Sequence, residues 1–228
     1  MTDNNTVAGE SIHKLPRLHV QSKELTQDPD AVVAHLYQLN EKPGAYFNKM
    51  GCGAFTTTMA ISHFHPTLGT YDSARTIYGR MQKVPFSGGG TFESQNARIA
   101  RQYGLLAKAY SRGTINDLIA AIDCGAPTIL LVQPRALFQI GKLEVLPIGR
   151  HDVLLVGYSS DSSGKPLRFF VDNPAVQSAP SQESLPQQYP GNESYTVPAL
   201  LETWTHSFTP IFGSAADYAR WRTRTGRD

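Results

Sequence analysis

NKMGCGAFTTTMAISHF, residues 48–64, is the most informative stretch of this chain, because it places a cysteine at the start of a predicted helix. Glycines flank Cys52, and the residues that follow predict a helix to about Phe64. His65-Pro66 ends it, because proline disfavours helical geometry in the residue before it. The first turn of a helix exposes unpaired backbone N–H groups that favour a negative charge. We therefore expect a lowered thiol pKa at Cys52 and a nucleophilic thiolate.

Two later segments carry residues that can act together with a thiol. GRHDVLLVGY, residues 149–158, sets His151 at the start of an apolar strand. FFVDNP, residues 169–174, ends another strand on a carboxylate and an amide. A histidine can take a proton from a thiol, and an asparagine or aspartate can orient that histidine. This order of residue types, each on a separate predicted element, is typical of nucleophilic cysteine hydrolases.

The composition is that of a globular protein of one domain. The 228 residues are 40% hydrophobic, and a formal net charge of +2 gives no electrostatic case for a nucleic-acid partner. The polar start, MTDNNTVAGESIHKLPRL, lacks the charged and apolar regions of a signal peptide, and no apolar run is long enough for a membrane segment. We expect a cytoplasmic protein with free thiols, while export by a signal-independent route stays open.

The first half of the chain is predicted to be helical. After a polar lead-in at residues 1–30, apolar spacing predicts helices at about 30–41, 52–64, 70–81, 91–103 and 114–125. Thr91 is expected to cap the fourth of these and Gly104 to end it. Thr114 and Asp117 match a capping box at the start of the fifth.

The second half is predicted to be β-structure. Branched and aromatic runs predict strands at 128–132, 143–148, 152–157 and 167–171, with a tight turn at 161–164. We expect a long loop at 175–195 and a short helix at 198–208 that carries Trp204. The predicted fold class is α+β, in which a helical N-terminal lobe with the nucleophile helix packs on an antiparallel β-sheet lobe. An active-site cleft is expected between the lobes.

The ordered segments resemble the papain-like cysteine peptidase clan and, within it, the stand-alone bacteriocin-processing (double-glycine) peptidase-like family. The matching stretches lie within residues 48–174 and are CGAFTTTMAISHF, IARQYGLLAKAY, GTINDLIAAIDCGAPTILLV, GRHDVLLVGYSSD and FFVDNP. The resemblance implies a papain-like fold, no metal or cofactor, and a peptide or protein substrate. The best-known members are fused to a membrane transporter and cut leader peptides after Gly-Gly. That substrate is not carried over to this chain, which has no predicted membrane segment.

By this resemblance Cys52 attacks a carbonyl carbon to form an acyl-enzyme, and His151 is the general base. Two residues are candidates for orienting the imidazole of His151. Asn173 stands directly before the proline, where the family usually has a carboxylate, and Asp172 stands one residue earlier. Because side chains alternate along a strand, only one of them can face His151, and position favours Asn173.

The oxyanion hole matches the family less well. The family usually has a glutamine six residues before the cysteine, and here that residue is Tyr46. Asn48 is the expected replacement, acting with the backbone N–H of Cys52. Loss of one such donor typically costs a rate factor of about a hundred or more. The missing glutamine therefore keeps a non-catalytic binding module open as an alternative.

Other residues of chemical interest are interpreted as structural. Cys124 ends an amphipathic helix and is expected to be a packing residue. His63 and His65 have the spacing of a metal pair but lack further ligands nearby. The glycine run at 88–90 lacks the lysine of a phosphate loop. The basic end of the chain, residues 216–228, is expected to be a solvated, frayed tail.

Together these observations predict a papain-like cysteine peptidase domain at 31–215, between the polar lead-in and the basic tail. A bacterial protein of this kind could process a peptide, or could act on a foreign protein as an effector or toxin. An acyltransferase of the same fold, phytochelatin-synthase-like or transglutaminase-like, is a second alternative, because it would share the nucleophile and the base. The sequence does not determine the substrate or the oligomeric state.

Overall fold

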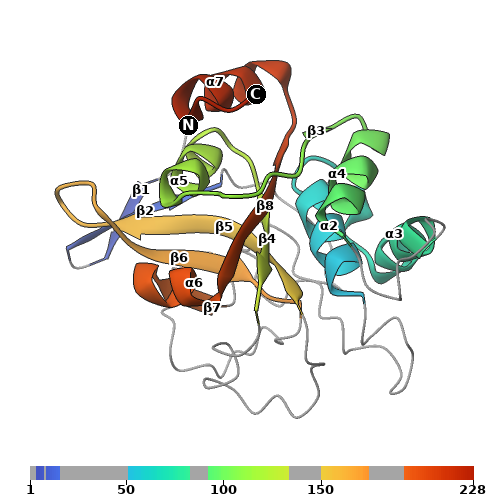
Figure 1. Ribbon diagram of the computed structural model, residues 1–228, viewed down its shortest axis with the longest axis horizontal. Helices are drawn as coiled ribbons and strands as arrows, with labels where there is room; N and C mark the ends of the chain where they lie inside the picture. Colours follow the sequence, from blue (N-terminus) through green and yellow to red (C-terminus); the bar gives the residue numbers. More distant parts are fainter. Residues whose placement is uncertain (1–3, 8, 16–50, 83–91, 134–149, 175–192) are drawn as a thin grey trace, which may run out of the picture.

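The computed structural model describes residues 4–7, 9–15, 51–82, 92–133, 150–174 and 193–228 (Figure 1). Several predicted features lie outside these residues: the helix at 30–41, the glycine run at 88–90, Thr91, the strand at 143–148, Tyr46 and Asn48.

An antiparallel sheet holds the described chain together. Its strands follow the order β1-β2-β5-β4-β8-β3, and β6 pairs with the free side of β5 while β7 pairs with β6. The long strand β5 is central, because it pairs with β4 along its first half and with β2 along its second. The strands are β1 (Asn4–Val7), β2 (Glu10–Lys14), β3 (Leu106–Ala107), β4 (Thr128–Val132), β5 (His151–Ser160), β6 (Pro166–Asp172), β7 (Glu193–Thr196) and β8 (Trp204–Phe212).

The helices lie in separate groups around this sheet. Figure 1 shows α2, α3 and α4 side by side, α5 and α7 together above the sheet, and α6 below it. Their bounds are α2 (Cys52–Ser62), the short 3-10 helix η2 (Pro66–Leu68), α3 (Tyr71–Gln82), α4 (Glu93–Gln102), α5 (Ile115–Asp123), α6 (Val197–Thr203) and α7 (Ala215–Thr225).

Helix α2 is the most deeply buried helix of the first group. Every residue after Cys52 is buried, so α2 shows no polar face, as expected for a helix enclosed on all sides. Thr56 and Thr58 donate to the carbonyl oxygens of Cys52 and Ala54, each at 2.7 Å, whereas the buried Thr57 Oγ1 has no hydrogen-bond partner among the described residues. The sequence can therefore place hydroxyl side chains inside the core at this helix.

The predicted helix ends are largely confirmed. The Asp117 carboxylate accepts from the Thr114 backbone N–H at 2.6 Å, and Thr114 Oγ1 accepts from the Asp117 N–H at 3.2 Å, which completes the capping box. Gly104 and Gly125 follow α4 and α5 with φ of +79° and +76°, a left-handed conformation that suits glycine. The prediction of Thr91 as the cap of α4 is wrong: the N-cap is Phe92, and the Gln95 side chain accepts from the Phe92 N–H at 2.8 Å.

Two segments differ from the sequence-based predictions. The polar lead-in contains the hairpin of β1 and β2, whose Ile12 is fully buried and which extends the sheet through β5. The predicted helix at 198–208 ends at Thr203, and Trp204 instead opens β8, which pairs with β4. Trp204 and Phe208 are buried four residues apart with exposed His206 between them, a spacing that favours a helix prediction. Strand β8 accommodates it by an irregularity at His206, whose φ is +63°, where the register against β4 shifts.

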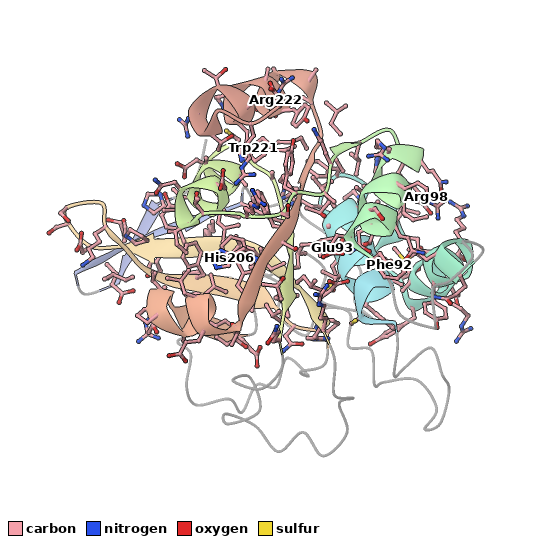
Figure 2. The ribbon with its side chains drawn as sticks, in the orientation of Figure 1. Phe92, Glu93, Arg98, His206, Trp221 and Arg222 are labelled. Carbon is pink, nitrogen blue, oxygen red and sulfur yellow. The ribbon has the colours of Figure 1, made fainter. Side chains whose placement is uncertain are left out.

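The prediction of a frayed basic tail is wrong. Residues 215–225 form α7, and its Trp221 is fully buried against the core between α7 and the sheet (Figure 2). Beyond the helix, the Arg227 guanidinium binds both carboxylate oxygens of Asp117, with Nε–Oδ1 at 2.6 Å and Nη2–Oδ2 at 2.8 Å. The arginines of this segment therefore include one structural anchor.

No helix in the described segments combines the length and the apolar character needed to cross a bilayer.

Candidate active site

Cys52 is the first residue of α2, directly after the N-cap Gly51. The Thr56 hydroxyl is one connection between this helix start and the sheet. Thr56 Oγ1 lies 2.7 Å from the carbonyl oxygen of Cys52 and 3.1 Å from that of Asp152. Because Asp152 follows His151 on β5, this hydroxyl brings the first turn of α2 against the strand that carries the predicted base.

The environment of the Cys52 thiol differs from the sequence-based expectation. Burial, and then the negative charge of Asp152, raise the pKa of the Cys52 thiol to about 12. The backbone N–H of Asp152, on β5, acts in the opposite direction, and so do those of Gly53 and Cys52, which are the predicted helix-start effect. That effect is real but smaller, so the prediction of a lowered pKa is wrong. The resting thiol is neutral at physiological pH.

Asp152 is itself held in place by a second buried polar residue. It is 2% exposed, and its Oδ2 accepts from the Nδ2 of Asn96 at 3.2 Å. Asn96 comes from α4 and is fully buried. The sequence analysis did not select either residue, although a carboxylate inside the apolar run after His151 was a usable signal.

His151 opens β5 and is 4% exposed. Its Nε2 lies 2.8 Å from the Oδ1 of Asn173. Burial lowers the pKa of the His151 imidazole, and the hydrogen bond to Asn173 opposes that shift. The imidazole is therefore neutral at pH 7, with its ring fixed by an amide oxygen.

Of the two residues before Pro174, Asn173 is the one that contacts His151. Asp172 is the last residue of β6, and it pairs with Leu154 in the ladder. Asn173 follows the strand directly and is 2% exposed. Its Nδ2 donates to the Oε2 of Glu193, on β7, at 2.8 Å. The sequence analysis placed Glu193 in a loop and assigned it no role.

The Cys52 thiol makes no hydrogen bond with His151 in the described part of the chain, so the structure brings their elements together without joining the two side chains. Asn48 lies outside the described residues, and nothing is derived from its position. Cys124 is 2% exposed and accepts a hydrogen bond from Arg220 Nε at 3.5 Å, a structural environment. No cluster of three metal-ligating side chains occurs within the described segments.

Comparison with known proteins points to one family. The model of the Peptidase_C39 like family matches residues 31–215. Among solved structures, a double glycine motif protease from an AMS/PCAT transporter, crystallised with the leader peptide, is 16% identical with a TM-score of 0.47, and the match covers 81% of this chain and 94% of that one. The peptidase domain of Streptococcus ComA, a bi-functional ABC transporter, is 14% identical with a TM-score of 0.42, covering 72% and 92%. No curated protein matches the chain.

Proposed function

Because this chain belongs to the Peptidase_C39-like family and is a cysteine peptidase, we propose that Cys52 is its nucleophile, His151 its general base and Asn173 the residue that orients the imidazole. The helices around α2 and the antiparallel sheet agree with the predicted papain-like α+β class.

One observation carries this assignment: the 2.8 Å contact between His151 Nε2 and Asn173 Oδ1, on a strand that touches the start of α2 through Thr56. An imidazole that donates from Nε2 keeps the lone pair of Nδ1 available for a proton. Orienting a histidine in this way is the part that the third residue of a catalytic triad plays.

The proposed reaction begins from a neutral pair, because burial raises the thiol pKa and lowers that of the imidazole. When a substrate carbonyl carbon approaches Cys52, the thiol proton passes to His151 Nδ1 as the S–C bond forms. The negative charge moves to the carbonyl oxygen, where the backbone N–H of Cys52 donates. We assign the second donor to Asn48.

The second half of the cycle reverses these proton transfers. His151 returns the proton to the leaving amine as the C–N bond breaks, which leaves an acyl-enzyme on Cys52. Water then attacks the thioester with His151 again as base, and the acid product departs as the thiol is restored. The substrate class is a peptide or protein with an accessible backbone amide.

The test uses the purified full chain with a degenerate library of internally quenched peptides between pH 5 and 9. We expect cleavage by the wild type and its loss, by at least about a thousandfold, in Cys52→Ala and His151→Ala. Cys124→Ala and the exposed His206→Ala serve as matched controls and should cleave at the wild-type rate.

A second measurement covers the case in which the library lacks the substrate. Intact-mass analysis after exposure to peptidyl vinyl sulfones should show one adduct, on Cys52, that forms more slowly in His151→Ala. Cleavage or adduct formation that survives Cys52→Ala would refute the assignment. An added amine acceptor that ends up joined to the product would show a transferase instead.

A further inference from the structure

We propose that Glu193 is a positioning residue for this site: it holds Asn173 in the orientation that makes His151 a base at Nδ1. The inference rests on the proposed roles of Cys52, His151 and Asn173, and it adds a fourth residue that touches neither substrate nor thiol.

The geometry is a chain of hydrogen bonds that leads away from the imidazole. His151 Nε2 lies 2.8 Å from Asn173 Oδ1, and Asn173 Nδ2 lies 2.8 Å from Glu193 Oε2. The hydroxyl of Tyr195 donates to the same carboxylate oxygen. These partners come from the start of β5, the end of β6 and from β7, so the chain crosses three strands.

The donor and acceptor groups of Glu193, Asn173 and His151 allow only one direction for these hydrogen bonds. An ionised carboxylate only accepts hydrogen bonds, so the amide NH₂ of Asn173 must face Glu193. The amide oxygen then faces His151, and Nε2 must carry the ring proton. Nδ1 is left with its lone pair. The Tyr195 hydroxyl, which also hydrogen-bonds with Asn173, can either donate or accept, so it does not select one end of the amide. Without the carboxylate, the amide could turn end for end with almost no change of shape, and the opposite tautomer of His151 would satisfy it.

The same contact explains why position 173 is an amide. A carboxylate there would lie at hydrogen-bond distance from Glu193, and two carboxylates that close cannot both ionise. Asn173 and Glu193 therefore function as a pair, with the negative charge one residue farther from the imidazole than in a Cys-His-Asp arrangement.

The charge of Glu193 is supported by hydrogen bonds alone. Burial raises the pKa of Glu193, and the donors on Tyr195 and Asn173 oppose that shift. No lysine or arginine in the described chain contributes. Glu193 therefore takes up a proton at a higher pH than an ordinary glutamate would, and a protonated Glu193 no longer dictates the amide orientation. Activity should fall as the pH drops through this transition.

The kinetic test compares Glu193→Ala, Glu193→Gln, Asn173→Asp and the double variant Asn173→Asp/Glu193→Gln. We expect Glu193→Ala to lower kcat by about tenfold to a hundredfold with little change in KM, as is typical when an outer partner that fixes a histidine tautomer is lost. Glu193→Gln keeps an oxygen that can accept from Asn173, so its smaller loss isolates the effect of charge, and the acid limb assigned to Glu193 should vanish from its pH profile.

The reciprocal exchange separates positioning from simple packing. Asn173→Asp alone places two carboxylates together and should be impaired. In the double variant the new amide at position 193 can donate to the new carboxylate at position 173, and that carboxylate accepts from His151, which restores every hydrogen bond to the imidazole in the same direction. We expect its kcat within about threefold of wild type. A double variant no better than Asn173→Asp would refute the pairing. The exposed Glu202→Gln on α6 is the matched control.

A spectroscopic measurement distinguishes failure of this inference from failure of the proposed function. Long-range ¹H–¹⁵N correlation spectra of the full chain report the tautomer of each histidine, and His151→Ala identifies the signal. We expect His151 to carry its proton on Nε2 in the wild type and to divide it between the two nitrogens in Glu193→Ala. A tautomer unchanged in Glu193→Ala refutes the positioning role, even if peptides are cleaved. The expected change in a chain that neither cleaves the library nor forms the Cys52 adduct supports the positioning role and refutes only the proposed catalytic roles.

Discussion

Replacing Asp152 by asparagine should make the Cys52 thiol more reactive, because Asp152 supplies the charge that raises the pKa of that thiol after burial itself. The substitution preserves shape, and the new side-chain oxygen can still accept from Asn96 Nδ2. Only the negative charge is removed. A neighbouring like charge typically shifts a pKa by about 1–3 units. The thiol pKa, now about 12, should fall by that amount.

The alkylation rate of Cys52 should rise by less than the fraction of Cys52 that is ionised. Below the pKa, each unit of lowering gives about ten times more thiolate, while each thiolate becomes about threefold less nucleophilic. The net increase is therefore about threefold per unit, or about threefold to thirtyfold for the whole shift. Alkylation by iodoacetamide at pH 7.5, followed by intact mass in a Cys124→Ala background, measures this rate for Cys52 alone.

An unchanged alkylation rate in Asp152→Asn would contradict this expectation. If Asp152→Asn alkylates at the parent rate across pH 6 to 10, the charge of Asp152 does not control the thiol, and burial alone sets its pKa. The exposed Asp72→Asn on α3 is the matched control and should leave the rate unchanged. A circular dichroism spectrum identical to that of the parent shows that the comparison is between folded proteins.

Three further predictions concern the framework, each measured as the free energy of unfolding in urea by circular dichroism. Trp221→Ala should cost about 3–5 kcal/mol, because the indole is fully buried. Arg227→Ala should cost about 1–3 kcal/mol, because it leaves the Asp117 carboxylate without its charged partner. Burial raises the pKa of Asp117, but the hydrogen bonds from Arg227 and Thr114 lower it below its ordinary value. The pair therefore stabilises the fold above about pH 4 and loses that effect as the pH falls through the lowered pKa. Gly113→Ala should cost about 1–3 kcal/mol by overpacking, because a Cβ there would lie 2.6 Å from the Trp204 ring.

Matched control variants accompany the second and third of these predictions. Arg75→Ala removes an arginine of α3 whose ion pair with Asp72 is exposed, and should change stability by less than about 0.5 kcal/mol. Gly79→Ala meets no atom within 4 Å inside α3 and should stabilise by about 0.5–1 kcal/mol. Equal costs for each variant and its control would refute the packing and ion-pair arguments.

The candidate site was partly predictable because three of its residues stand at ends of elements, where sequence signals are strongest. Gly51 and the helix that follows it mark Cys52, and Pro174 marks the end of the strand before Asn173. His151 begins an apolar run. Caps, prolines and hydrophobic patterns are local, so they can be recognised without the fold.

Glu193 and Asn96 depend on long-range pairing, so no local signal could find them. Glu193 reaches Asn173 because β7 pairs with β6 in a register that sets Val171 opposite Glu193. Asn96 reaches Asp152 because α4 packs beside α2, which in turn packs on β5. The direction of the thiol pKa was missed for the same reason: the helix start is visible in the sequence, while the surrounding burial is a property of the folded chain.

The position of β8 sets the moment at which this peptidase can first work during its synthesis. Cys52, His151, Asn173 and Glu193 are all synthesised before residues 204–212, yet β4 lacks its neighbour on one side until β8 is added. Translation proceeds at about 5–20 residues per second, so a growing chain spends about a second or more with every reactive group present and the sheet that aligns them unfinished. We expect the nascent polypeptide to be inert toward its own unfolded segments and toward neighbouring nascent chains.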